Sequence, residues 1–132
     1  MKRKYSYWLL FAVPLLLLCS CKKSYVVDFK VLNDSDDAIL VMLQRTESSA
    51  VDTSFLDGGQ DLIIHTEMGE KLTAKKYVFD LTELPFHNII VQNVNGLGLL
   101  CDEDRLSCWN RTSNSDAKEY GSVFLQVTET SF

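Results

Sequence analysis

The sequence has few of the residues and none of the motifs that mark common catalytic chains. It holds two histidines, two prolines and six glycines in 132 residues. No Gly-x-Ser-x-Gly, His-Glu-x-x-His, Gly-x-Gly-x-x-Gly or phosphate-loop pattern occurs, so the usual nucleophile, zinc and nucleotide schemes lack their local signatures. Thirteen Lys and Arg against 18 Asp and Glu give a net charge of −5, which excludes the basic surface typical of nucleic-acid binding. We therefore predict a chain that is not an enzyme and has no cofactor.

The chain begins with a short basic segment followed by an apolar one. Lys2, Arg3 and Lys4 precede the apolar run Trp8–Leu18. That run is too short for a transmembrane helix, which needs about 20 apolar residues, but it has the length of the apolar region of a secretory signal. We predict that residues 1–20 are a cleaved signal peptide.

The end of this segment, Leu18-Cys19-Ser20-Cys21, resembles the lipobox of bacterial lipoproteins. Cys21 is the acceptor that fits, because modification of Cys19 would place the bulky Leu18 at the position that requires a small residue. The resemblance implies a lipidated Cys21 at the start of the mature chain and attachment to a membrane, which we expect to be the outer membrane. Ordinary cleavage to a soluble secreted protein is the alternative, and the sequence resembles no specific domain family.

The mature chain would be acidic and closely tethered. Without residues 1–20 it carries 10 Lys and Arg against 18 Asp and Glu. Only Lys22, Lys23 and Ser24 separate Cys21 from the first predicted strand, a reach of about 10 to 14 Å. We expect the domain to lie on the lipid headgroups and its partner to be in or near the membrane.

Two cysteines remain after lipidation. Cys101 and Cys108 form an even pair in an exported chain, which predicts a disulfide. Unpaired thiols and a metal or redox role are the alternatives. Neither histidine, His65 or His87, has zinc-ligand spacing to these cysteines, so we predict no metal site.

Alternating apolar and polar residues dominate the mature chain. Val27, Phe29 and Val31 share one face of a predicted strand. The apolar run within Ala38–Gln44 predicts a central strand covered on both faces. Residues 45–54 are assigned to a loop or a weak edge strand. Further strands are predicted at Tyr25–Leu32, Leu62–Thr66, Lys76–Leu81 and Tyr120–Thr128.

Phe86–Cys101 contains the clearest hairpin pattern, with Asn95-Gly96 as a two-residue turn. This turn predicts a register in which Gln92 faces Leu99 and Ile90 faces Cys101.

Seven or eight short strands with turn residues between them predict an all-β fold. We predict a single domain over residues 25–132: a small antiparallel β-sandwich of immunoglobulin-like architecture, with a small β-barrel as the alternative.

Two further features are candidates for partner contact. Asp102, Glu103 and Asp104 lie inside the predicted disulfide loop and are either a solvated loop, a contact for a basic partner or, less in keeping with their spacing, calcium ligands. Trp109 is either a core residue that packs on the disulfide or an exposed contact for a partner or a sugar. The acidic segment Asp34–Asp37 lacks the glycine and distal glutamate of a calcium loop, which favours a plain turn.

Together these features predict a membrane-anchored lipoprotein that acts as a non-catalytic binding or accessory subunit at the bacterial cell envelope. Its expected partners are the membrane and an envelope protein or polymer, with no nucleic acid. The acidic charge keeps an inhibitor of a basic hydrolase such as lysozyme as one alternative. A small carboxylate-dependent enzyme is the other, because paired carboxylates become visible only in space.

Overall fold

The computed structural model describes residues 24–44, 50–70, 73–86, 88–113 and 119–132. These residues form two separate sheets, one with the strand order β4-β1-β7-β6 and the other with the order β3-β2-β5. The predicted small β-sandwich is therefore confirmed, and the described strands do not close into a barrel. The strands are β1 (Tyr25–Asn33), β2 (Ile39–Gln44), β3 (Val51–Leu56), β4 (Asp61–Gly69), β5 (Ile89–Asn93), β6 (Asn110–Ser113) and β7 (Tyr120–Val127).

The core lies between the inner faces of the two sheets. Val27, Phe29 and Val31 on β1 are fully buried, as the alternation predicts. Strand β7 contributes Val123, Leu125 and Val127 to the same core. A period of two places alternate residues on one face, and here that face is apolar in both central strands of the larger sheet.

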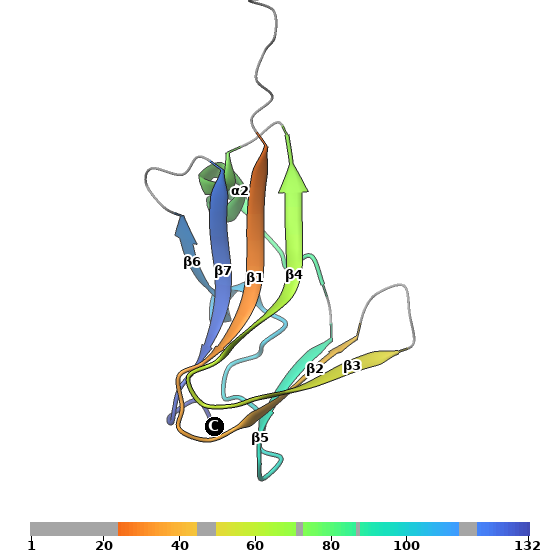
Figure 1. Ribbon diagram of the computed structural model, residues 1–132, viewed down its shortest axis with the longest axis vertical. Helices are drawn as coiled ribbons and strands as arrows, with labels where there is room; N and C mark the ends of the chain where they lie inside the picture. Colours follow the sequence, from red (N-terminus) through yellow and green to blue (C-terminus); the bar gives the residue numbers. More distant parts are fainter. Residues whose placement is uncertain (1–23, 45–49, 71–72, 87, 114–118) are drawn as a thin grey trace, which may run out of the picture.

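One strand pair departs from the antiparallel pattern. β1 and β7 pair in parallel, with Val27 opposite Gly121 and Val31 opposite Leu125. The first and last strands of the domain thus lie side by side at the centre of the four-stranded sheet (Figure 1). A parallel pair requires a crossover connection. Here that connection is the chain from β2 to β6.

Asn33 links the two turns that connect the sheets, residues 34–38 between β1 and β2 and residues 57–60 between β3 and β4. Its side-chain Nδ2 donates to the backbone oxygens of Asp37 and Leu56, at 2.8 and 2.9 Å. Its Oδ1 accepts from the Ser35 hydroxyl at 2.6 Å, and its backbone oxygen accepts from Gly59 N at 2.7 Å. The segment Asp34–Asp37 is therefore a turn organised by a buried asparagine.

β2 is central in its sheet but is covered on one face only. Ile39, Val41 and Leu43 are buried, whereas Leu40 and Met42 on the outer face are partly exposed. The prediction of cover on both faces is not met by the described residues, because no second layer of them lies over this face.

A helix replaces one predicted strand. Lys76–Leu81 was expected to be extended, but α2 (Ala74–Asp80) occupies this region. Thr73 caps the helix by accepting from Lys76 N at 3.2 Å. Ala74 and Val78, four residues apart, are both buried, so the helical period dominates over the alternation.

The predicted hairpin after β5 has a different register. A three-residue loop, Val94–Gly96, replaces the two-residue turn, and Gln92 bridges to Gly98 instead of Leu99. Asn93 Oδ1 accepts from the backbone nitrogens of Asn95 and Leu97, at 3.0 Å each. Gly96 has a φ of 76°, the left-handed conformation that such a loop requires.

None of the helices in the described ranges is long and apolar enough to cross a bilayer.

Candidate functional site: the open side of the sandwich

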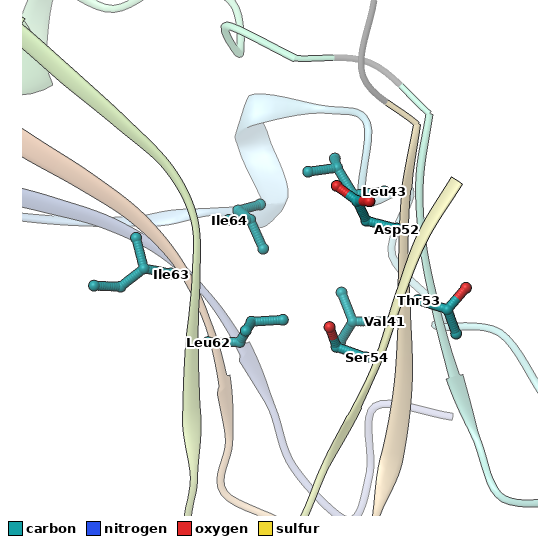
Figure 2. A pocket seen from close by; sticks show the side chains of 8 residues that line it. All are labelled: Val41, Leu43, Asp52, Thr53, Ser54, Leu62, Ile63 and Ile64. Atoms are coloured by element: carbon teal, nitrogen blue, oxygen red, sulfur yellow. The ribbon is translucent and has the colours of Figure 1, made fainter. Parts of the chain in front are cut away.

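The sandwich is open along the side formed by β3 and β4. These strands leave a shared turn and diverge into different sheets (Figure 1). Between them lies a groove with a volume of about 330 Å³. Figure 2 shows Leu62 and Ile64 pointing from β4 toward Val41 and Leu43 on β2. The groove therefore has an apolar floor that reaches the core.

A bulge in β4 shapes one wall of this groove. The pairing of β1 with β4 shifts between Phe29 and Lys30, which face His65 and Ile63, so that Ile64 has no opposite residue. Bulges at sheet edges redirect side chains, and Figure 2 shows Ile63 pointing away from the groove while Ile64 points into it. Ile63 is 51% exposed on the outer face.

β3 forms the other wall and is the edge strand of its sheet. Gln44 N donates to Asn88 O across the β2–β5 pair. Alternate residues of an antiparallel strand direct their backbone groups to opposite sides. The backbone groups of Leu43, Val41 and Ile39 therefore point toward β3. Their partners on β3 are Asp52, Ser54 and Leu56.

The backbone groups of the remaining β3 residues therefore point away from β2. These are Val51, Thr53 and Phe55, and among the described residues we find no partner for their N–H groups. The side chains of Val51 and Phe55 are also exposed, at 52% and 77%. A free edge with apolar side chains is a template for pairing with another strand.

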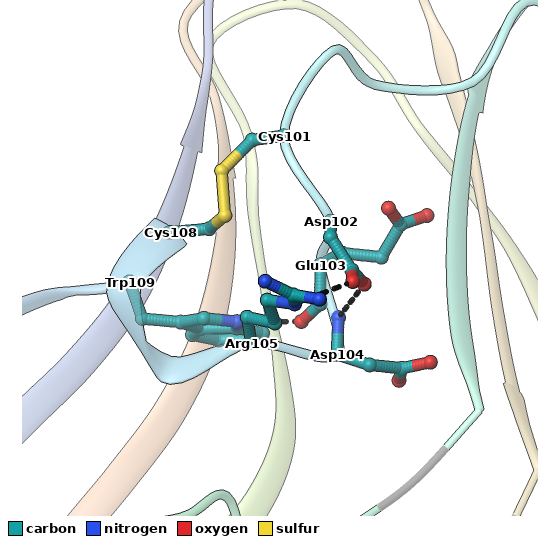
Figure 3. Close-up of polar contacts among 7 residues, drawn as sticks. All are labelled: Cys101, Asp102, Glu103, Asp104, Arg105, Cys108 and Trp109. Atoms are coloured by element: carbon teal, nitrogen blue, oxygen red, sulfur yellow. Dashed lines mark hydrogen bonds and ion pairs between the residues drawn. A yellow bond between two sulfur atoms is a disulfide. The ribbon is translucent and has the colours of Figure 1, made fainter.

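The disulfide loop lies at the opposite edge of the same sheet. Cys101 and Cys108 are joined in the structure, with their Cα atoms 6.1 Å apart. Within the loop, Arg105 Nε lies 2.9 Å from Asp102 Oδ2, and Asp102 Oδ1 accepts from Asp104 N at 3.3 Å (Figure 3). The loop ends in the short 3-10 helix η1 (Leu106–Cys108).

Two carboxylates of this loop cap the free edge of β5. Glu103 Oε1 accepts from Val91 N at 3.0 Å, and Asp104 Oδ1 accepts from Ile89 N at 3.1 Å. Hydrogen bonds to an ionised acceptor are the stronger kind. All three acidic residues that are candidates for partner contact thus accept hydrogen bonds from the chain's own backbone, Glu103 and Asp104 from β5 and Asp102 from within the loop.

Trp109 belongs to the core. Its side chain is 5% exposed, its ring packs against Phe86 with a centroid distance of 5.5 Å, and its indole nitrogen donates to Glu103 O at 2.8 Å (Figure 3). Of the two alternatives for Trp109, the structure shows the core position, with Phe86 as the ring contact. The bond also fixes the backbone of the capping loop, which links the core to the protected edge.

Of the two histidines, the structure describes His65. His65 Nε2 lies 3.3 Å from Glu67 Oε2, and its ring packs near Phe29, with centroids 5.7 Å apart. His87 and Cys21 fall outside the described residues. Within the described ranges, no set of three or more His, Cys, Asp and Glu residues is placed to hold a metal ion.

One polar cluster has no counterpart in the sequence analysis. Asp28 is 8% exposed on the outer face of the larger sheet. It accepts hydrogen bonds from the Tyr120 hydroxyl at 2.6 Å and the Thr66 hydroxyl at 2.8 Å. The bond to Asp28, together with burial, raises the pKa of Tyr120 to about 12. The parallel β1–β7 register brings Asp28 and Tyr120 together, and no local sequence pattern predicts this contact.

Comparison with family models, with curated proteins and with solved structures gave no match for this chain.

Proposed function

We propose that this chain is a lipid-anchored, non-catalytic binding protein of the bacterial cell envelope, with the open side of the sandwich as its docking surface. The anchor would be Cys21, for which the lipobox-like sequence is the support. β1 begins at Tyr25, so the folded domain would start four residues after the lipid. At about 3.5 Å per residue, this tether keeps the domain against the headgroups.

The unequal treatment of the two edges of the smaller sheet carries the binding proposal. The chain uses a disulfide loop and two carboxylates to cover β5. It leaves β3 with outward backbone groups and an exposed Phe55. Because a long uncovered edge promotes unwanted association, an edge left open beside an apolar groove is best explained by a partner that covers it.

The use of the carboxylates supports a non-catalytic role. Asp28, Glu103 and Asp104 each accept hydrogen bonds from within the chain. In this arrangement they position backbone and hydroxyl groups of the fold.

The anchor is tested by matched cysteine variants of the full chain expressed in a bacterium with a lipoprotein-processing pathway. We expect Cys21→Ser to move the protein out of the membrane fraction, whereas Cys19→Ser stays with the membrane. Mass spectrometry of the native chain should find acylated Cys21 at the mature amino terminus. An unmodified thiol at Cys21, or membrane association that survives Cys21→Ser, would overturn the anchor.

The docking surface is tested by placing a photo-crosslinking amino acid at one of two exposed phenylalanines. Phe55 lies on the open edge and is 77% exposed, and Phe79 on α2 is 53% exposed. We expect specific adducts in cells from position 55 and not from position 79. Adducts from position 79 alone, or from neither position, would contradict the proposed surface.

A further inference from the structure

We propose that the occupant of the open β3 edge is a second copy of this chain, which pairs β3 with β3 about a two-fold axis at Thr53. This inference rests on the docking surface of the proposed function and names its partner. It follows from the register of β3, the charges along that strand and the protection of β5.

The backbone of β3 is complementary to itself. The outward groups belong to Val51, Thr53 and Phe55, which are spaced by two residues. A two-fold axis at Thr53 places Thr53 opposite its own copy and Val51 opposite Phe55 of the second chain. All of these positions are then hydrogen-bonded pairs, each of which exchanges two N–H to O bonds in an antiparallel ladder.

The side chains in this register also match. On the outer face, exposed Val51 would contact exposed Phe55 of the second copy, and such pairs of a β-branched and an aromatic residue stabilise antiparallel sheets. Thr53 would face Thr53, another favourable pair. On the inner face Asp52 would face Ser54, so no carboxylate lies directly opposite its own copy.

The resulting assembly would be closed. Pairing through β3 joins two sheets of order β3-β2-β5 into one continuous sheet whose two outer strands are both β5. Both of these edges carry the Glu103 and Asp104 caps. An isologous contact that uses up the open β3 edge stops at two copies, and the protected β5 edge prevents extension into a fibre.

Thr53→Cys tests this geometry in the full chain. Mild oxidation of membranes should link the two Thr53→Cys positions across the axis, because opposite residues of an antiparallel pair meet the distance requirement of a disulfide. Thr112→Cys, an exposed position on β6, is the matched control, and the unsubstituted chain gives the background. We expect a homodimer band for Thr53→Cys only. No band, equal bands for both variants, or a product that contains another protein would overturn the proposal.

Thr53→Pro provides a second measurement. The N–H of Thr53 faces away from β2, so proline there removes no bond within the chain but blocks the proposed pairing. We expect sedimentation of the detergent-extracted full chain to show association weakened about tenfold or more, with circular dichroism and thermal unfolding of the fold retained. A folded Thr53→Pro chain that associates as strongly as the unsubstituted chain would contradict the proposal.

These results are separable from those for the anchor. A dimer of an unacylated chain would refute the anchor and keep the pairing, and an acylated monomer would refute the pairing and keep the anchor.

Discussion

The two edges of the smaller sheet contrast in how the chain treats them. β5 receives carboxylates from the disulfide loop on the N–H groups of Ile89 and Val91. β3, on the other side of the shared neighbour β2, directs the backbone groups of Val51, Thr53 and Phe55 outward. The exposure of the β3 edge is therefore selective, because the chain covers the β5 edge with its disulfide loop and does not cover β3 in the same way.

The largest effect is expected from removing the disulfide that holds the capping loop. Replacing Cys101 and Cys108 by serine should lower the free energy of unfolding by about 2 to 3 kcal/mol, because the reduced chain regains the entropy of the open loop. Urea denaturation measures this change. Hydrogen exchange should also become faster at Ile89 and Val91. Unchanged exchange at these amides would show that the loop does not depend on the disulfide to cap β5.

A smaller loss is expected from removing one cap. Glu103→Ala deletes the acceptor for Val91 N and should destabilise the fold by roughly 1 to 2 kcal/mol, the lower part of the range for a donor that is left without its hydrogen-bond partner. Glu103→Gln keeps an acceptor oxygen and should recover part of this loss. Asp80→Ala, at an exposed position on α2, which packs on the larger sheet, should change stability by less than about 0.5 kcal/mol. Equal effects of Glu103→Ala and Asp80→Ala would remove the distinction between the edges.

Substitution on the open edge should affect folding least. Thr53→Pro leaves the bonds of β3 to β2 in place, so the unfolding free energy of the monomer should change by less than about 0.5 kcal/mol at high dilution. A loss as large as that of Glu103→Ala would mean that the outward face of β3 already has a partner within the chain.

Tyr120 offers a reference far from both edges. Its hydrogen bond to Asp28, together with burial, raises its pKa to about 12. The folded state therefore binds the phenol proton more tightly than the unfolded state, and this stabilisation is present below pH 10 and lost as the pH rises from 10 to about 12. Asp28→Asn should lower the pKa of Tyr120 toward 10 in an ultraviolet titration, whereas Glu103→Ala and Thr53→Pro should leave it unchanged. A shift in an edge variant would show that the substitution disturbs the larger sheet.

The sequence predicted the features that depend on local period and turn chemistry. The buried face of β1, the turn at Asp34–Asp37 and the overall sandwich follow from alternation and from residues with special backbone preferences. The Cys101–Cys108 pair follows from counting cysteines.

What could not be predicted depends on competition between local signals or on contacts between distant segments. Thr73, Ala74 and Val78 form a helix because the cap and the four-residue spacing act together, while the alternation of Tyr77 and Phe79 pointed to a strand. Asn93 extended the β5 loop by one residue through its side chain. The roles of Glu103 and Asp104 needed knowledge of where β5 lies, which no local pattern in the acidic segment contains.

Site-resolved hydrogen exchange of the native chain at several concentrations tests the central claim most directly. We predict that the amides of Ile89 and Val91 are protected at every concentration, while those of Val51, Thr53 and Phe55 exchange rapidly in the dilute monomer and become protected as the chain associates. Rapid exchange at Ile89 and Val91, or β3 amides whose exchange does not change with association, would contradict an account in which one edge is closed by the chain and the other is reserved for its partner.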